Sequence, residues 1–96
     1  MRKLLWYLIA GTKGGINRAR IIHTLNARPY NANQLSERLD LDYKTIQHHI
    51  KVLKENHLIT EEGNGYGNIF FLDGSLQKEY ETFEQIWALV KKENDN

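Results

Sequence analysis

The chain has 96 residues, 41% of them hydrophobic, and a formal net charge of +1 at neutral pH. This length fits one small globular domain, whose limited core makes dimerisation a source of extra stability. The sequence contains no cysteine, which excludes disulfides, thiolate metal sites and thiol redox sensors.

The charge is distributed unevenly along the chain. Residues 1–57 contain ten Lys or Arg against four Asp or Glu, whereas residues 58–96 contain three against eight. The first part therefore has a formal charge of +6 and the second a charge of −5. This asymmetry concentrates positive potential on the first part of the chain, as attraction to phosphates requires.

Residues 2–10 are predicted to form a first helix. Their basic start and apolar stretch resemble a secretory signal, but the stretch is short and no clean cleavage site follows it. The stretch is also too short to span a bilayer, so we expect no membrane partner. The residues expected to be buried are Leu4, Leu5, Leu8 and Ile9. We expect Trp6 and Tyr7 to face a partner, and we place Leu5 with Trp6 in a dimer interface.

A glycine-rich joint at residues 11–15 precedes a second predicted helix at residues 17–27. The joint is a weak candidate for a phosphate-binding loop because it lacks the Walker spacing and no strand precedes it. Arg18 and Arg20 lie near the start of this helix, where cations oppose the helix dipole. A phosphate contact would explain this placement, and simple solubility is the alternative.

Two short helices around a tight turn are predicted at residues 32–40 and 42–56. Their inner stripes consist of Leu35 and Leu39 in the first helix and Ile46, Ile50 and Leu53 in the second. Asp42 is expected to cap the second helix, because its carboxylate can accept the free amide hydrogens at the positive end of the dipole. This arrangement is a helix-turn-helix.

The outward face of the second helix carries groups that can hydrogen-bond base edges. It consists of Tyr43, Lys44, Gln47, His48 and Lys51. An α-helix fits the major groove of B-DNA, where each base pair presents a distinct pattern of donors and acceptors. The face therefore points to double-stranded DNA, with an ordinary solvated surface as the alternative.

A β-hairpin is predicted at residues 58–72, because two strand candidates flank a glycine-rich turn. Residues 28–31 are expected to form a short strand that pairs with this hairpin, with Pro29 at a position that needs no ladder donor. The segment 61–68 contains two acids and no Lys or Arg. We therefore expect the hairpin to be a minor DNA contact, through backbone amides and Tyr66.

The segment 75–92 is predicted to form a long C-terminal helix with a heptad seam. The seam consists of Leu76, Tyr80, Phe83, Trp87 and Val90. A small domain has little interior to cover five bulky residues, so we expect a second copy to cover them; packing onto the same domain is the alternative. Such a twofold dimer, assisted by residues 2–10, would place two recognition helices in successive major grooves about 34 Å apart.

A helix-turn-helix followed at once by a glycine-rich hairpin resembles the winged-helix transcriptional regulators, in particular the ArsR-like branch and its small archaeal members. The resemblance is strongest over residues 41–59, where the polar triplet, the buried aliphatics and His49 match the family's recognition helix, and it extends over residues 14–72. It implies a mainly α fold with a small β-hairpin: one winged-helix domain over residues 1–96, with N- and C-terminal dimerisation helices.

Two positions depart from the family pattern. Asp40 and His57 stand where glycine is common, in the turn and just after the recognition helix. Both positions are expected to need left-handed backbone, which Asp and His tolerate better than most residues.

The resemblance implies a cytoplasmic, sequence-specific regulator that binds an inverted-repeat operator as a homodimer. Phosphate attraction is assigned to Lys44, Lys51, Arg18, Arg20 and Arg38, and base discrimination to Gln47, His48 and Tyr43. No cofactor is expected. A metal site is not expected either, because residues 75–92 contain no histidine and the neighbouring His48 and His49 diverge by about 100° on a helix.

Two other classes of function compete with DNA binding. The acidic second part of the chain and the hairpin without cations favour a docking module inside a larger protein complex as the alternative. An enzyme is not expected, because no nucleophile has a placed base and no cofactor loop is present.

Overall fold

A computed structural model of the chain describes residues 1–65 and 67–94. The described part is mainly helical, with a small antiparallel sheet, in agreement with the predicted fold class. The elements in chain order are α1 (Arg2–Leu5), η1 (Trp6–Ala10), α2 (Gly15–Ala27), β1 (Tyr30–Asn31), α3 (Ala32–Leu39), α4 (Tyr43–Glu55), β2 (Ile59–Glu62), β3 (Ile69–Leu72), α5 (Gly74–Lys78) and α6 (Tyr80–Asn94). None of the described helices has the length and apolarity needed to cross a membrane.

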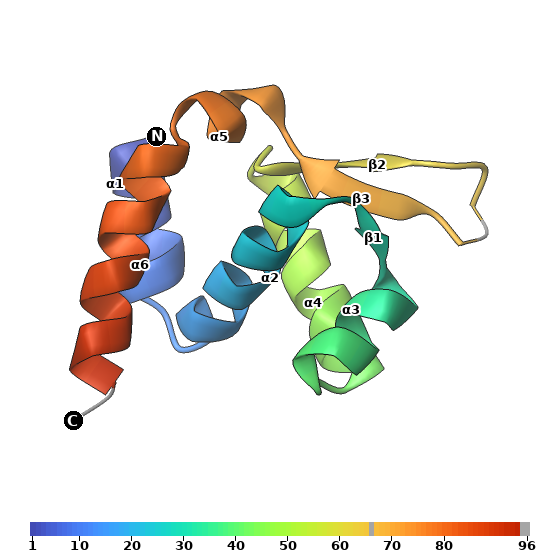
Figure 1. The fold of residues 1–96 in the computed structure, drawn as a ribbon, viewed down its shortest axis with the longest axis horizontal. Helices are drawn as coiled ribbons and strands as arrows, with labels where there is room; N and C mark the ends of the chain where they lie inside the picture. The colour runs from blue at the N-terminus through green and yellow to red at the C-terminus, as the bar shows by residue number, and fades with distance from the viewer. Residues whose placement is uncertain (66, 95–96) are drawn as a thin grey trace.

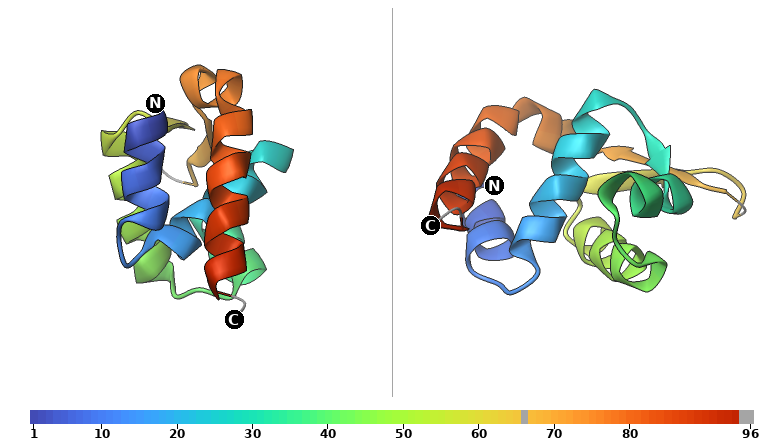
Figure 2. Two further views of the ribbon diagram at one scale, coloured as in Figure 1. Left: turned by 90° about the vertical axis from the view of Figure 1, so that its left-hand side faces the viewer. Right: turned by 60° about the horizontal axis from the view of Figure 1, so that its bottom comes forward.

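The elements are arranged around α2, which contacts η1, α3, α4, α6 and β3. At one end of the molecule, α6 lies alongside α1 and η1 (Figures 1 and 2). At the other end, the hairpin of β2 and β3 projects beyond α3 and α4 (Figure 1). The two ends predicted for dimerisation and for DNA binding are therefore separated by α2.

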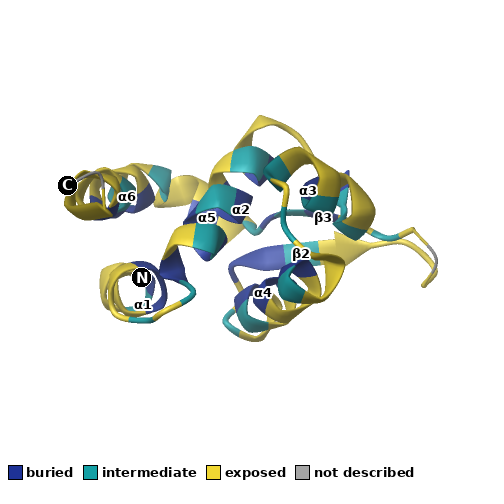
Figure 3. Cartoon of the chain, turned by 90° about the horizontal axis from the view of Figure 1, so that it is seen from below, coloured by how far each residue is buried: buried dark blue, intermediate teal, exposed yellow. Residues whose placement is uncertain are grey.

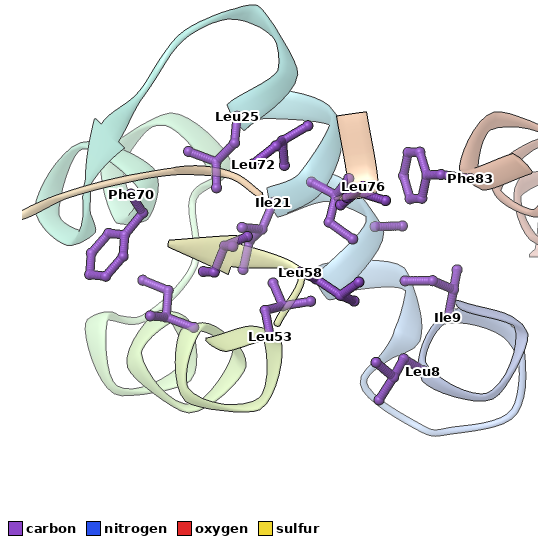
Figure 4. Close-up of a cluster of buried hydrophobic side chains, with 14 of the residues drawn as sticks. Leu8, Ile9, Ile21, Leu25, Leu53, Leu58, Phe70, Leu72, Leu76 and Phe83 are labelled. Carbon is purple, nitrogen blue, oxygen red and sulfur yellow. The ribbon is translucent and has the colours of Figure 1, made fainter. Parts of the chain in front are cut away.

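One continuous hydrophobic core joins these elements, as one domain requires. Figure 4 shows side chains from both ends of the chain meeting beside α2. They include Leu8, Ile9, Ile21, Leu25, Leu53, Leu58, Phe70, Leu72, Leu76 and Phe83.

The N-terminal helix continues to Ala10, as predicted, but its second half is a π-helix. The amide of Gly11 donates to the carbonyls of Trp6 and Tyr7 at 3.0 and 3.1 Å, which closes the wider turn. After the joint, α2 begins at Gly15, two residues earlier than expected. A Cβ at Gly15 would lie 1.8 Å from the carbonyl oxygen of Ile9, so only glycine permits this approach of α2 to η1.

The sheet has the order β1-β3-β2, with both pairs antiparallel. Tyr30 lies opposite Phe70 in the β1–β3 pair, and Ile59 lies opposite Leu72 in the β2–β3 pair. The predicted pairing of the short strand with the hairpin is thus confirmed. Pro29 precedes the strand, where no ladder hydrogen bond is required of it.

Left-handed backbone occurs at both non-glycine positions where it was expected. Asp40, which ends α3, has φ 53°, and His57, which follows α4, has φ 58°. At the first position the amide of Leu41 donates to the carbonyl of Ser36, and the Ser36 hydroxyl donates back to the carbonyl of Leu41. These bonds satisfy groups at the end of α3 and support the tight turn.

The C-terminal segment is two helices and not one, so this part of the prediction is wrong. Asp73 caps α5 by accepting hydrogen bonds from the amide and hydroxyl of Ser75 at 3.0 and 2.6 Å. The backbone leaves the helical conformation at Glu79, with φ −107° and ψ 18°, and α6 then returns alongside α1 (Figure 1). The turn lets α5 place Leu76 in the core while α6 packs against η1.

The heptad seam faces the core of the same chain, which corrects the predicted dimer interface. Leu76 and Phe83 are 0% exposed and Val90 is 5% exposed; Leu5, on α1, is also 0% exposed. These four side chains have no surface left to offer a partner. Tyr80 and Trp87 are half-buried against the same core.

Candidate nucleic-acid interface

The helix-turn-helix is held by a cap at the start of each helix. Asp42 Oδ2 accepts a hydrogen bond from the amide of Lys44 at 3.1 Å, as predicted for α4. At α3, Asn31 and Gln34 form a capping box, in which each side chain accepts from the other residue's amide at 2.8 Å. Sequence reasoning missed this box, although the pattern of an Asn followed three residues later by a Gln resembles its usual signature.

The outward face of α4 is exposed over its whole length. Its residues are Tyr43, Lys44, Gln47, His48 and Lys51. The opposite side of the helix, with Ile46, Ile50 and Leu53, is buried. Figure 3 shows this division, with buried residues of α4 toward the body of the molecule and exposed residues away from it. The predicted polar face is therefore open to solvent, and its contact with DNA stays a prediction.

A groove of about 810 Å³ lies between α4, the start of α3 and the hairpin. Its polar lining consists of Asn31, Asn33, Tyr43, Gln47, Lys51, Lys54, Glu55, Glu61 and Asn68. Sequence reasoning placed only Tyr43, Gln47 and Lys51 of these on the DNA-facing surface. Lys44 and His48 lie on the same exposed face of α4 but outside the groove.

Lys54 is the cation of this groove that sequence reasoning missed. It forms an ion pair with Glu61 of β2, which joins the end of α4 to the hairpin. Its position seven residues after Gln47 is the signal that could have identified it, because residues two turns apart share a helix face. Nearby, Lys51 Nζ lies 4.0 Å from a carboxylate oxygen of Glu55.

Arg18 is not available for a phosphate contact, so this assignment is wrong. Its side chain is 5% exposed, and Nε donates to the carbonyl of Leu8 at 3.0 Å. Nη2 donates to the hydroxyl of Thr12, and Nη1 lies 3.4 Å from Nδ1 of His49. The guanidinium therefore joins η1 and the joint to α4 inside the molecule.

Arg20 and Arg38 remain at the surface in different settings. Arg20 donates to the carbonyl of Leu39 at 2.7 Å and to Asn17 at 3.2 Å, so part of its hydrogen-bonding capacity joins α2 to α3. The guanidinium of Arg38 lies 5.0 Å from the centre of the Tyr30 ring. Arg28 lies 4.5 Å from the same ring, so Tyr30 holds two cations beside α3.

His49 is buried on the inner side of α4, in contrast with its exposed neighbour His48. Burial, together with the positive charge of Arg18 and the proximity of His48, lowers the pKa of His49 to about 4. The ring is therefore neutral at pH 7, and Nδ1 can accept a hydrogen bond from Arg18. His49 has an internal role and does not face the groove.

The predicted contact of Tyr66 lies outside the described residues. In residues 1–65 and 67–94, no three His, Asp or Glu side chains form a cluster able to hold a metal ion.

Residues 17–61 match the family model described as bacterial regulatory protein, arsR family. No curated protein matches the chain.

Several solved structures are similar in fold. A probable transcriptional regulator from Pseudomonas aeruginosa has a TM-score of 0.72 and 18% identity, over 96% of this chain and 72% of that chain. Rv0081 from M. tuberculosis has a TM-score of 0.69 and 14% identity, over 98% and 93% of the two chains. Reduced HlyU from Vibrio cholerae N16961 has a TM-score of 0.63 and 14% identity, over 94% and 82%.

The family match includes most of α2, both helices of the helix-turn-helix and the start of the hairpin. The structural similarities extend over the terminal helices as well, at identities that show the fold alone. Residues 17–61 thus resemble the ArsR-family helix-turn-helix, and the chain as a whole has the winged-helix fold of the compared regulators.

Proposed function

We propose that this protein regulates transcription by binding an inverted-repeat operator as a homodimer, in a sequence-specific manner. The observation that supports this most directly is the exposed polar face of α4, which opens onto the groove beside the hairpin. A helix with amide, imidazole and phenol groups on its free side has the donors and acceptors that base edges in the major groove require.

Within this proposal, Gln47, His48 and Tyr43 discriminate bases. Lys44, Lys51 and Arg38 attract phosphates, and Arg20 contributes a weaker contact because two of its donors are already used. Phosphate contacts of this kind supply affinity without sequence preference, so the three base-facing side chains carry the specificity.

The dimer interface in this proposal uses the exposed apolar residues at the end formed by η1 and α6. Trp6 is 49% exposed, Tyr7 is 61% exposed and Leu89 is 51% exposed, with the half-buried Trp87 on the same helix as Leu89. Because η1 and α6 lie side by side, their free faces can meet a second copy together. This arrangement keeps the predicted terminal helices and the predicted Trp6, Tyr7 and Trp87 at the interface, adds Leu89, and leaves out the buried residues of the seam.

The regulator is proposed to act in the cytoplasm without a metal sensor or cofactor. The absence of cysteine removes thiolate ligands, and residues 75–92 contain no histidine. A DNA-binding regulator of this kind does not require an enzymatic activity.

The test is selection of bound fragments from a random pool of duplex DNA. The expected result is an enriched sequence with two half-sites related by inversion and separated by about one helical turn. An enriched single half-site would contradict the dimer, and no enrichment would contradict sequence-specific binding. Failure to shift any duplex on a gel at low salt would favour the docking module.

A further inference from the structure

We propose that Lys54 is a further residue able to bind a phosphate of the DNA backbone, and that its ion pair with Glu61 of the hairpin prevents this contact. This inference rests on the proposed DNA binding. It assigns to Glu61, a residue of the hairpin, the effect of weakening that binding. The sequence places both acids of the hairpin in a segment without Lys or Arg, and the structure gives one of them a specific partner.

Lys54 has the position of a DNA contact. It lies seven residues after Gln47, which is about 10 Å along the helix, and it lines the same groove as Gln47 and Lys51. Its side chain is 43% exposed, so a phosphate could approach the ammonium group from solvent. A free lysine at this place would extend the positive surface of α4 toward the hairpin.

Glu61 is held in position by the hairpin itself. One carboxylate oxygen pairs with Lys54, and the other accepts a hydrogen bond from Asn68 Nδ2 at 2.7 Å. Asn68 Oδ1 in turn accepts from the amide of Gly65 at 2.8 Å. The hydrogen bonds from Lys54 and Asn68 hold the pKa of Glu61 below its usual value, so the carboxylate is charged at neutral pH.

The consequence is that an anion of the protein occupies the place where a phosphate would sit. An exposed ion pair of this kind contributes little to the stability of the fold, so a change at Glu61 can release Lys54 without unfolding the hairpin. Release adds one neutralised phosphate to the complex and removes one negative charge from the groove.

The test uses Glu61→Gln, which keeps the shape of the side chain and an acceptor for Asn68. Binding to a short duplex of random sequence is measured across a salt series by fluorescence anisotropy. We expect the plot of log affinity against log salt to steepen by about one unit, and the affinity near 0.1 M salt to rise about three- to tenfold.

Two further variants separate release of Lys54 from simple loss of negative charge. Glu62→Gln removes the neighbouring acid, which is exposed and forms no ion pair within the described part of the chain, and should leave the slope unchanged. In a Lys54→Met background, Glu61→Gln should no longer steepen the slope. Thermal unfolding followed by circular dichroism confirms that each variant is folded.

The outcomes distinguish this inference from the function on which it rests. A wild-type protein that binds no duplex DNA at low salt would overturn both. A wild-type protein that binds DNA, with a slope that Glu61→Gln leaves unchanged or steepens equally without Lys54, would overturn only the role of Glu61 and Lys54.

Discussion

Arg18 and His49 meet inside the molecule, where Arg18 bonds to a backbone carbonyl and a hydroxyl, and the burial of His49 beside this cation is expected to make stability depend on pH. The pKa of His49 is lowered from 6.5 to about 4 in the folded state. As the pH falls below about 6.5, the unfolded chain therefore binds a proton that the folded chain does not. Stability should be full above pH 7 and fall progressively toward pH 4, by at most about 3 kcal/mol.

Urea unfolding between pH 7.5 and 4.5 measures this loss, and His49→Gln should reduce it, because Gln accepts from Arg18 without titrating. The matched control is His48→Gln, at the exposed neighbour, which should leave the slope of stability against pH close to that of the wild type. Equal slopes for the wild type and His49→Gln would contradict the internal role of His49.

Gly15 lies where the backbone of η1 leaves no space for a side chain. Substitution by alanine would place a Cβ 1.8 Å from the carbonyl oxygen of Ile9, so α2 and η1 must separate. We expect Gly15→Ala to lower the free energy of unfolding by about 2–3 kcal/mol. Gly74→Ala is the control, because a Cβ there meets nothing within 4 Å. Denaturant unfolding compares the two, and similar stabilities would contradict the close approach.

Gln47 is the residue at which base recognition can be tested. If its amide contacts an adenine through two hydrogen bonds, Gln47→Ala should weaken operator binding by about 1–3 kcal/mol at one base step. Binding to a scrambled duplex should change much less. The measurement is anisotropy titration on both duplexes, and an equal loss on both would remove Gln47 from base discrimination.

At the scale of elements, the capping box of α3 ties the helix-turn-helix to the sheet, because Asn31 belongs to both β1 and the cap. Asn31→Ala leaves the amide of Gln34 without its acceptor. We expect a loss of about 1 kcal/mol in the free energy of unfolding. Asn33→Ala, at an exposed position in the same turn, should cost less, and the order of the two variants in urea unfolding checks the cap.

Local signals predicted most elements, and their failures have a common cause. The Asp42 cap and the left-handed Asp40 and His57 were predictable, because each depends on neighbouring backbone. The break at Glu79 was not predictable from periodicity, because the apolar stripe continues across it. The stripe shows that one side is buried and does not show that the segment turns toward η1.

For the molecule as a whole, the exposed apolar residues of η1 and α6 predict a homodimer. Leu89→Glu places a charge on a side chain that is 51% exposed, so it should leave the fold intact and separate a dimer into monomers. Ile69→Glu, at a 38% exposed position on the hairpin, is the control and should stay dimeric. Sedimentation velocity over a concentration series gives the result, and an unchanged distribution for Leu89→Glu would exclude this end as the interface.

Sequence patterns alone predicted the helix-turn-helix, the Asp42 cap, the outward polar face of α4 and the hairpin, because these features depend on periodicity and on residues close in the chain. Tertiary packing, by contrast, places Arg18 inside the molecule, directs the heptad seam onto the chain's own core and pairs Glu61 with Lys54. Each of these features depends on which segments distant in the sequence pack together, and the residue pattern of one helix does not predict which segment packs against it.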